Sequence, residues 1–150
     1  MALFNRVKSC SVEDINDGLY EAKGTFIDTF HEIHLTIQVK KDNLEIVKAK
    51  ADLVRIPHKY CKEAQDRDRY LVGLKIGSGL VKAIGDAVGK ELGCVHLVDL
   101  TLDLTKAVMI ANTKVVELSL NKEEMLDKYI GLFSGTCYHW TTMGKVKKDG

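Results

Sequence analysis

The feature that most constrains the fold is a change of hydrophobic period at Pro57, the only proline among 150 residues. Before Pro57, apolar and polar residues alternate, most clearly in HLTIQVK (34–40), where one parity carries Leu35, Ile37 and Val39. Alternation at period two between short polar turns is typical of antiparallel strands with one face in water. We therefore predict a meander of strands over 3–11, 19–29, 33–40 and 44–55.

After Pro57 the pattern becomes helical. The polar segment HKYCKEAQDRDRY (58–70) predicts a short surface helix. Residues 80–92 form an amphipathic stripe at three- and four-residue spacing, and Gly93 suits the left-handed position that ends a helix. Residues 94–112 fit both a strand alternation and a helical stripe, and their length without Gly or Pro favours a helix.

The C-terminal third begins with a capping signal. Asn121 is followed three residues later by Glu124, which predicts the start of a helix. The segment from Ser134 onward predicts a turn and an edge strand, and 144–150 is expected to be a frayed basic tail. Strands first and helices second predict one α+β domain over 1–150, an antiparallel sheet with helices packed on one face.

Charge and composition limit the classes of partner. Lys plus Arg number 22 and Asp plus Glu 21, so bulk charge provides no affinity for nucleic acid or for an anionic membrane. The start of the chain lacks the pattern of a secretory signal, and no apolar run approaches the ~18 residues of a membrane span. We expect a cytoplasmic protein whose four cysteines are reduced.

Cysteine and histidine residues form the main candidate site. The predicted metal ligands are Cys61, Cys94, His96 and Cys137. Cys94 has the strongest individual case, because free backbone N–H groups at a helix N-terminus favour a thiolate. Thiolates combined with imidazole suit zinc or an iron–sulfur cluster, so these are the expected cofactors. The Cys-x-His spacing occurs twice, at 94/96 and at 137/139.

The same residues also have a purely structural interpretation. Cys94 can be a small residue at a close helix–sheet contact, and Cys10 has no histidine near it in the sequence. The phrase DTFHEIH (28–34) is not the HExxH zinc motif, because Leu35 occupies the place of the second histidine. Asp28 or His31 would line a cleft if the strand bends at DTF.

The order of several short phrases resembles a bacterial family of uncharacterised domains. The phrases are the DTFH-containing strand, PHKYC, LVGLKIGSG, GCVHL and CYHW, over residues 15–145. The family has no established activity, and some members accompany genes for aromatic or steroid breakdown. The chain is more distantly similar to iron–sulfur cluster assembly scaffold proteins, a resemblance that implies Cys61, Cys94 and Cys137 as cluster ligands, although Lys62 stands where the scaffolds have aspartate.

Three functions stay open at this point. The first is a metal or iron–sulfur protein, and the second is a non-enzymatic accessory protein that forms homo-oligomers through sheet edges or the 94–112 helix. The third is a binder of a small apolar or acyl ligand in a cleft between sheet and helices. The sequence predicts no catalytic residue and no reaction.

Overall fold

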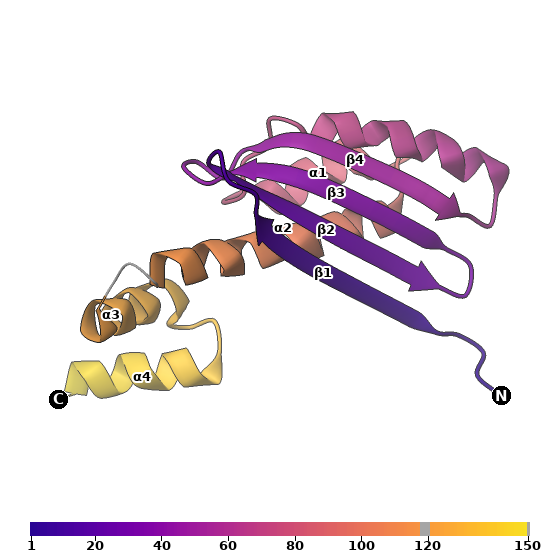
Figure 1. The fold of residues 1–150 in the computed structure, drawn as a ribbon. Helices are drawn as coiled ribbons and strands as arrows, with labels where there is room; N and C mark the ends of the chain where they lie inside the picture. The colour runs from indigo at the N-terminus through magenta and orange to yellow at the C-terminus, as the bar shows by residue number, and fades with distance from the viewer. Residues whose placement is uncertain (118–120, 150) are drawn as a thin grey trace. The chain divides into compact units, whose positions relative to one another are not determined.

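The fold is α+β, with a four-stranded antiparallel meander followed by helices, as predicted (Figure 1). The computed structural model describes residues 1–117 and 121–149. The strands lie in the order β1–β2–β3–β4 and are β1 (Arg6–Asp14), β2 (Leu19–Asp28), β3 (Glu32–Lys40) and β4 (Ile46–Arg55). The helices are η1 (Lys59–Leu71, a 3₁₀ helix), α1 (Leu80–Val88), α2 (Val95–Glu117), α3 (Lys122–Phe133) and α4 (Tyr138–Asp149).

Two compact units make up the chain, Met1–Ala111 and Asn112–Gly150. The sheet, η1 and α1 belong to the first unit, and α3 and α4 belong to the second. The prediction of one domain over 1–150 stays a prediction.

The core of the first unit lies on one face of the sheet. Alternate residues of β2 and β3 are buried, as their period-two pattern requires, while the other parity stays open to water. α2 crosses behind this face and buries Leu97, Leu100, Leu104 and Val108 (Figure 1). At Gly24 of β2 an added Cβ would lie 2.8 Å from the Leu100 side chain, so this glycine lets α2 approach the sheet closely.

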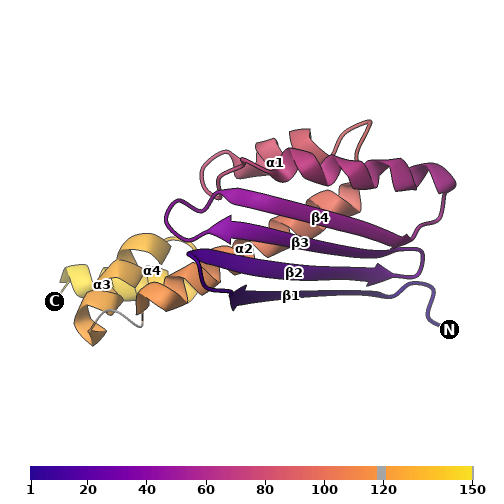
Figure 2. The ribbon, with the colours of Figure 1, turned by 45° about the horizontal axis from the view of Figure 1, so that its top comes forward.

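The outer edge of β4 is covered by η1, which runs beside it (Figure 2). The Asp68 carboxylate accepts from the Ala51 N–H at 2.7 Å, and the Gln65 side chain accepts from the Leu53 N–H at 3.0 Å. Polar side chains of η1 therefore satisfy backbone groups that a further strand would otherwise pair. This explains why the polar segment after Pro57 lies against the sheet.

The second unit contains the predicted helix that begins with a capping box. Asn121 accepts from the N–H groups of Glu123 and Glu124, and the Glu124 side chain accepts from the Asn121 N–H. The expected edge strand after Ser134 is wrong, because residues 138–149 form α4. Trp140 of α4 packs on Tyr129 of α3 with ring centroids 5.5 Å apart, a contact between helices that the local pattern does not reveal.

The end of α1 differs from the sequence-based expectation in one detail. α1 ends at Val88, and the left-handed residue after it is Lys90, with φ 59°, instead of Gly93. A Cβ at Gly93 would lie 2.1 Å from the Val88 carbonyl oxygen. Glycine is needed at position 93 because the chain passes close to the backbone at the end of α1 there. The Cys94 N–H donates to the Val88 carbonyl, which places Cys94 directly before α2.

Candidate functional site

The turn between β2 and β3 is built around the carboxylate of Asp28. Its Oδ1 accepts from the backbone N–H groups of Phe30 at 2.9 Å and His31 at 2.7 Å, which is the local geometry that aspartate favours in turns. The Asp28 N–H in turn donates to the His31 carbonyl at 2.9 Å. The phrase DTFH therefore folds on itself and holds the His31 side chain next to Asp28.

Arg55, at the end of β4, fastens this turn from outside. Its guanidinium donates to the carbonyl oxygens of Asp28 and Thr29, both at 3.0 Å, and of His31 at 3.2 Å. The register between β3 and β4 shifts where Arg55 pairs with Glu32, so Val54 is an extra residue at this point. Bulges of this kind re-aim side chains near functional sites, and here the bulge precedes the arginine that binds the turn.

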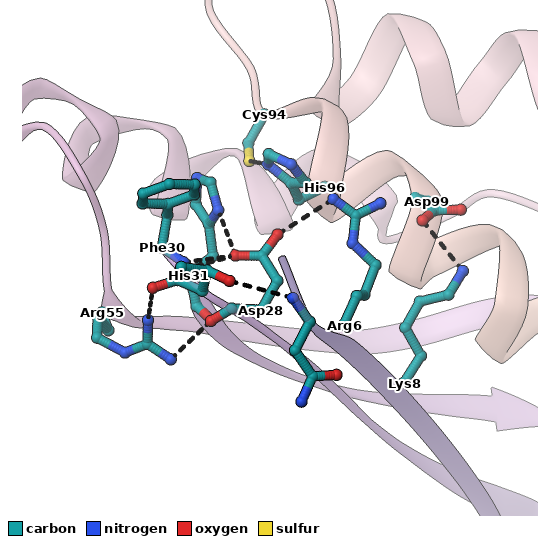
Figure 3. A network of polar contacts seen from close by, with 11 residues as sticks. Arg6, Lys8, Asp28, Phe30, His31, Arg55, Cys94, His96 and Asp99 are labelled. Carbon is teal, nitrogen blue, oxygen red and sulfur yellow. Dashed lines mark hydrogen bonds and ion pairs between the residues drawn. The ribbon is translucent and has the colours of Figure 1, made fainter. Parts of the chain in front are cut away.

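Three potential metal ligands meet at this turn. Ligand atoms of Asp28, His31 and His96 all lie within 4.8 Å of one another. Asp28 and His31 come from the β2–β3 turn, whereas His96 lies in the first turn of α2, as Figure 3 shows. Because a zinc–ligand bond measures about 2.0–2.2 Å, small side-chain movements would bring all three atoms onto one ion.

Asp28 is the charged centre of the cluster. Its side chain is 2% exposed, and besides the turn it accepts from His31 Nδ1 at 3.0 Å and Arg6 at 3.1 Å. Burial by itself raises the pKa of this carboxyl, but hydrogen bonds from Phe30, His31 and Arg6 outweigh burial and hold the pKa well below its usual range. Asp28 is therefore an ionised carboxylate that orients the His31 ring.

The imidazole rings of His31 and His96 pack against each other, and the ring of Phe26 packs against His96. The His31 and His96 ring centroids lie 4.1 Å apart, and the Phe26 ring lies 4.9 Å from that of His96. Burial is the main cause that lowers the pKa of His96, and the electrostatic influence of His31 and Arg6 adds to it, while Asp28 and Asp99 oppose it. The neutral imidazole that results at pH 7 is the form that binds metals and accepts protons.

Cys94 adjoins the cluster at the start of α2. The N–H of Val98 donates to the Cys94 carbonyl, so Cys94 is the residue that caps the helix, as predicted. Its Sγ lies 3.9 Å from His96 Nδ1 (Figure 3). Two imidazoles and a carboxylate thus lie within 4.8 Å of one another, and the thiol adjoins them through His96, a donor set that suits zinc or acid–base chemistry.

The sequence-predicted ligands are divided by the structure. His96 belongs to the three-residue cluster and Cys94 adjoins it. Cys61 lies in η1, and Cys137 lies in the second unit, directly before α4. The grouping found among residues 1–117 and 121–149 consists of Asp28, His31 and His96, so it contains neither Cys61 nor Cys137. Their participation in a metal site stays a prediction.

Asp28 and His31 were absent from the predicted ligand set. The sequence feature that could have identified them is the phrase DTFH, in which an aspartate precedes a histidine by three residues between two predicted strands. An aspartate at that place commonly forms a turn with its own backbone, and the turn brings the later histidine onto its carboxylate. From the sequence, a role for Asp28 or His31 depends on a bend of the strand at DTF. The chain does turn there, around the Asp28 carboxylate.

Comparison with known proteins identifies one family. Residues 10–110 match the model of a family described as Protein of unknown function (DUF2889). No curated protein and no solved structure matches the chain. Among the described residues, no helix is both long enough and apolar enough to cross a membrane.

Proposed function

This chain belongs to the family of unknown function DUF2889, and we propose that its first unit is a metal-binding module that holds one Zn²⁺. The ligands are Asp28, His31 and His96, and the Cys94 thiolate is the fourth donor. The observation that carries the proposal is the approach of three ligand atoms to within 4.8 Å of one another. Carboxylate, imidazole and thiolate are all established ligands of zinc.

The surroundings of the cluster support this function. His31 Nδ1 hydrogen-bonds the Asp28 carboxylate at 3.0 Å, which holds the ring in place and leaves Nε2 as the nitrogen that would bind the ion. The negative charge of Asp28 and a thiolate at Cys94 would offset the 2+ charge of the ion. In the metal-free form, Arg6 forms an ion pair with Asp28 at 3.1 Å, which balances the charge of the buried carboxylate.

A mononuclear site fits the residues better than an iron–sulfur cluster. Clusters are held mainly by thiolates, and even the histidine-ligated kind uses two cysteines. The group at the β2–β3 turn has one adjoining thiol, Cys94. An iron–sulfur cluster at this group, or a function like that of the assembly scaffolds, would require Cys61 or Cys137 as a further thiolate ligand.

The experiment is a cobalt titration of chelator-treated protein, followed by zinc competition. We expect one Co²⁺ per chain, a tetrahedral visible spectrum and a sulfur-to-cobalt charge-transfer band. Cys94→Ser should lose the charge-transfer band, while His31→Ala and His96→Ala should bind at least tenfold more weakly. His34→Ala is the matched control, because His34 is exposed and pairs with Glu32.

Two results would contradict the proposal: no cobalt binding by the wild-type protein, or equal loss of binding in His34→Ala. A charge-transfer band that survives Cys94→Ser and disappears in Cys61→Ser or Cys137→Ser would replace the ligand set with the one predicted from the thiols.

One observation favours a second function, thiol chemistry without metal. Cys94 lies at the N-terminus of α2 beside the neutral imidazole of His96, an arrangement found around nucleophilic cysteines. The rate of Cys94 alkylation by iodoacetamide, mapped by mass spectrometry, separates the two functions. Zinc should suppress the reaction at Cys94 and leave Cys61 unaffected if the site binds metal. A Cys94 rate that zinc leaves unchanged and His96→Ala lowers would favour thiol chemistry.

A further inference from the structure

The two edges of the sheet differ in how their backbone groups are satisfied. At β4, side chains of η1 bond the N–H groups of Ala51 and Leu53, and Lys62 donates to the Leu53 carbonyl. At the opposite edge the sheet order ends with β1 in the described part of the chain, and eight of the nine β1 residues are exposed. β1 is therefore the edge at which another strand can add.

The phase of the β1–β2 ladder shows which β1 residues direct their backbone outward. The Thr29 N–H donates to the Asn5 carbonyl at 3.2 Å, and the Ile15 N–H donates to the Leu19 carbonyl at 3.3 Å. The β1 residues that form hydrogen-bonded pairs with β2 are therefore odd-numbered at both ends of the ladder. Because bonded and non-bonded pairs alternate along an antiparallel ladder, the same holds for the residues between. The residues whose N–H and C=O groups point to the open edge are Arg6, Lys8, Cys10, Val12 and Asp14.

The charges of β1 are distributed unevenly along its length. Arg6 and Lys8 lie in its first half, whereas Glu13 and Asp14 end it. Charged residues normally protect an edge strand from pairing, because burying an unpaired charge is costly. Here each of them has a partner within its own chain, and the pairs are Arg6–Asp28, Lys8–Asp99, Glu13–Lys23 and Asp14–Lys41.

We propose that β1 is a dimerisation edge, and that it pairs antiparallel with β1 of a second copy about a two-fold axis at Cys10. This register places Arg6 opposite Asp14 of the second copy, Lys8 opposite Val12, and Cys10 opposite Cys10. All outward-pointing residues then meet each other, so every free N–H and C=O of the strand gains a partner. The two sheets become one continuous sheet with both core faces on the same side.

Charge complementarity favours this register, in addition to the ion pairs that Arg6 and Asp14 form within their own chain. The basic first half of each strand meets the acidic end of the other, with Asp14 of the second copy opposite Arg6 and diagonal to Lys8. A shift by two residues shortens the ladder and separates Arg6 from Asp14. A shift by one residue puts outward-pointing groups out of phase and turns the core faces to opposite sides.

The position of Cys10 makes the proposal testable by cross-linking. Directly opposed residues of a bonded antiparallel pair have Cα atoms about 5.5 Å apart. That distance lies within the range that a disulfide spans. Cys10 is exposed in the single chain, so an oxidant reaches it.

The experiment is sedimentation equilibrium of the full chain over a concentration series, paired with mild copper-catalysed oxidation. We expect the apparent mass to rise from 16.7 kDa to twice that value, and peptide mapping to identify a Cys10–Cys10 disulfide. Cys10→Ser should still dimerise without the cross-link. Cys10→Pro should stay monomeric and folded, because the phase of the ladder directs the Cys10 N–H away from β2 and proline is tolerated on an open edge.

Several outcomes would overturn the proposal. They are a monomer at all concentrations, a dimer whose disulfide maps to Cys61 or Cys137 and not to Cys10, and a dimer that Cys10→Pro leaves intact. Should Cys10→Pro fail to fold by circular dichroism, Asp14→Lys replaces it. Asp14→Lys places an ammonium group of each copy against Arg6 of the other, so it should weaken the dimer at least tenfold, and an unchanged dimer would refute the register.

Discussion

The ring of His31, in the β2–β3 turn, lies 4.1 Å from the ring of His96, in the first turn of α2, with the planes tilted by 39°. This contact joins the hairpin to the helix layer at the point where the Asp28 carboxylate and the Cys94 thiol also approach. The Phe26 ring packs against the His96 ring, with the two centroids 4.9 Å apart, and restricts its position. The candidate site is therefore the end of the core, where apolar packing gives way to polar groups.

Zinc is expected to stabilise the folded protein. A ligand that binds only the native state adds about 2.7 kcal/mol to the free energy of unfolding at a concentration of 100 Kd. Thermal unfolding with and without zinc should show this increase in the wild type and in His34→Ala, and lose it in His96→Ala. A melting temperature that zinc leaves unchanged in the wild-type protein would count against the site.

Removal of the Asp28 carboxylate should destabilise the metal-free fold. Asp28→Ala removes the buried acceptor of the N–H groups of Phe30 and His31 and of the Arg6 guanidinium. Hydrogen bonds to charged groups contribute about 1.5–3 kcal/mol each, but the exposed donors of Phe30 and Arg6 can bind water instead, so we expect a loss of about 3 kcal/mol in urea unfolding. Asp28→Asn keeps one acceptor oxygen and should lose less. Equal stability of Asp28→Ala and wild type would show that the turn forms without the carboxylate.

The same carboxylate predicts an acid limb in the stability profile. Its pKa in the folded state is held below the ordinary value, so the unfolded chain binds the proton more readily. The stabilisation by Asp28 is complete above about pH 4 and is lost as the pH falls toward the folded-state pKa. Urea unfolding between pH 5 and pH 2, in metal-free protein, should show a steeper decline for wild type than for Asp28→Asn. Parallel profiles of the two proteins would contradict this.

Arg55 is expected to act through the geometry of the turn. It donates to three carbonyl oxygens, at Asp28, Thr29 and His31, a fork that a lysine cannot reproduce. Arg55→Lys keeps the charge but should weaken cobalt binding about 10- to 100-fold, as loss of outer-shell support does in metal sites. Lys50→Arg, in the same strand, is the control, because it also exchanges lysine and arginine but lies away from the turn. Unchanged cobalt affinity in Arg55→Lys would mean that the turn holds its shape without the fork.

Gly24 and Gly85 form a matched pair for the packing of the core. A methyl group at Gly24 would lie 2.8 Å from Leu100 and 3.0 Å from Leu104, so Gly24→Ala should cost about 1–3 kcal/mol. Gly85 lies within α1 with no neighbour within 4 Å of the added carbon, so Gly85→Ala should stabilise by up to about 1 kcal/mol. Chemical unfolding of both variants measures the contrast. Equal effects would show that α2 does not rest on β2 at this position.

Much of the fold could be predicted because its signals are local. Alternation along β2, β3 and β4 placed their bounds within two residues of those observed, since one face of each strand is buried and the other is wet. The edge strand β1 was placed three residues too early, because a strand exposed on nearly all residues carries little alternation. α4 was missed for a related reason: its stabilising contact, Trp140 with Tyr129, joins two helices.

The sequence by itself determined the order of the four strands and of the helices up to α3, the start of α2 directly after Cys94, and the presence of Cys94 and His96 on one short phrase. Those properties follow from hydrophobic period and capping, which act between near neighbours. Only the tertiary structure decided that Asp28 and His31 join His96, because that meeting requires α2 to lie across β2 at Gly24 and Arg55 to hold the turn from β4. A site assembled from a turn and a distant helix depends on how those elements pack, and packing is not encoded in the spacing of its residues.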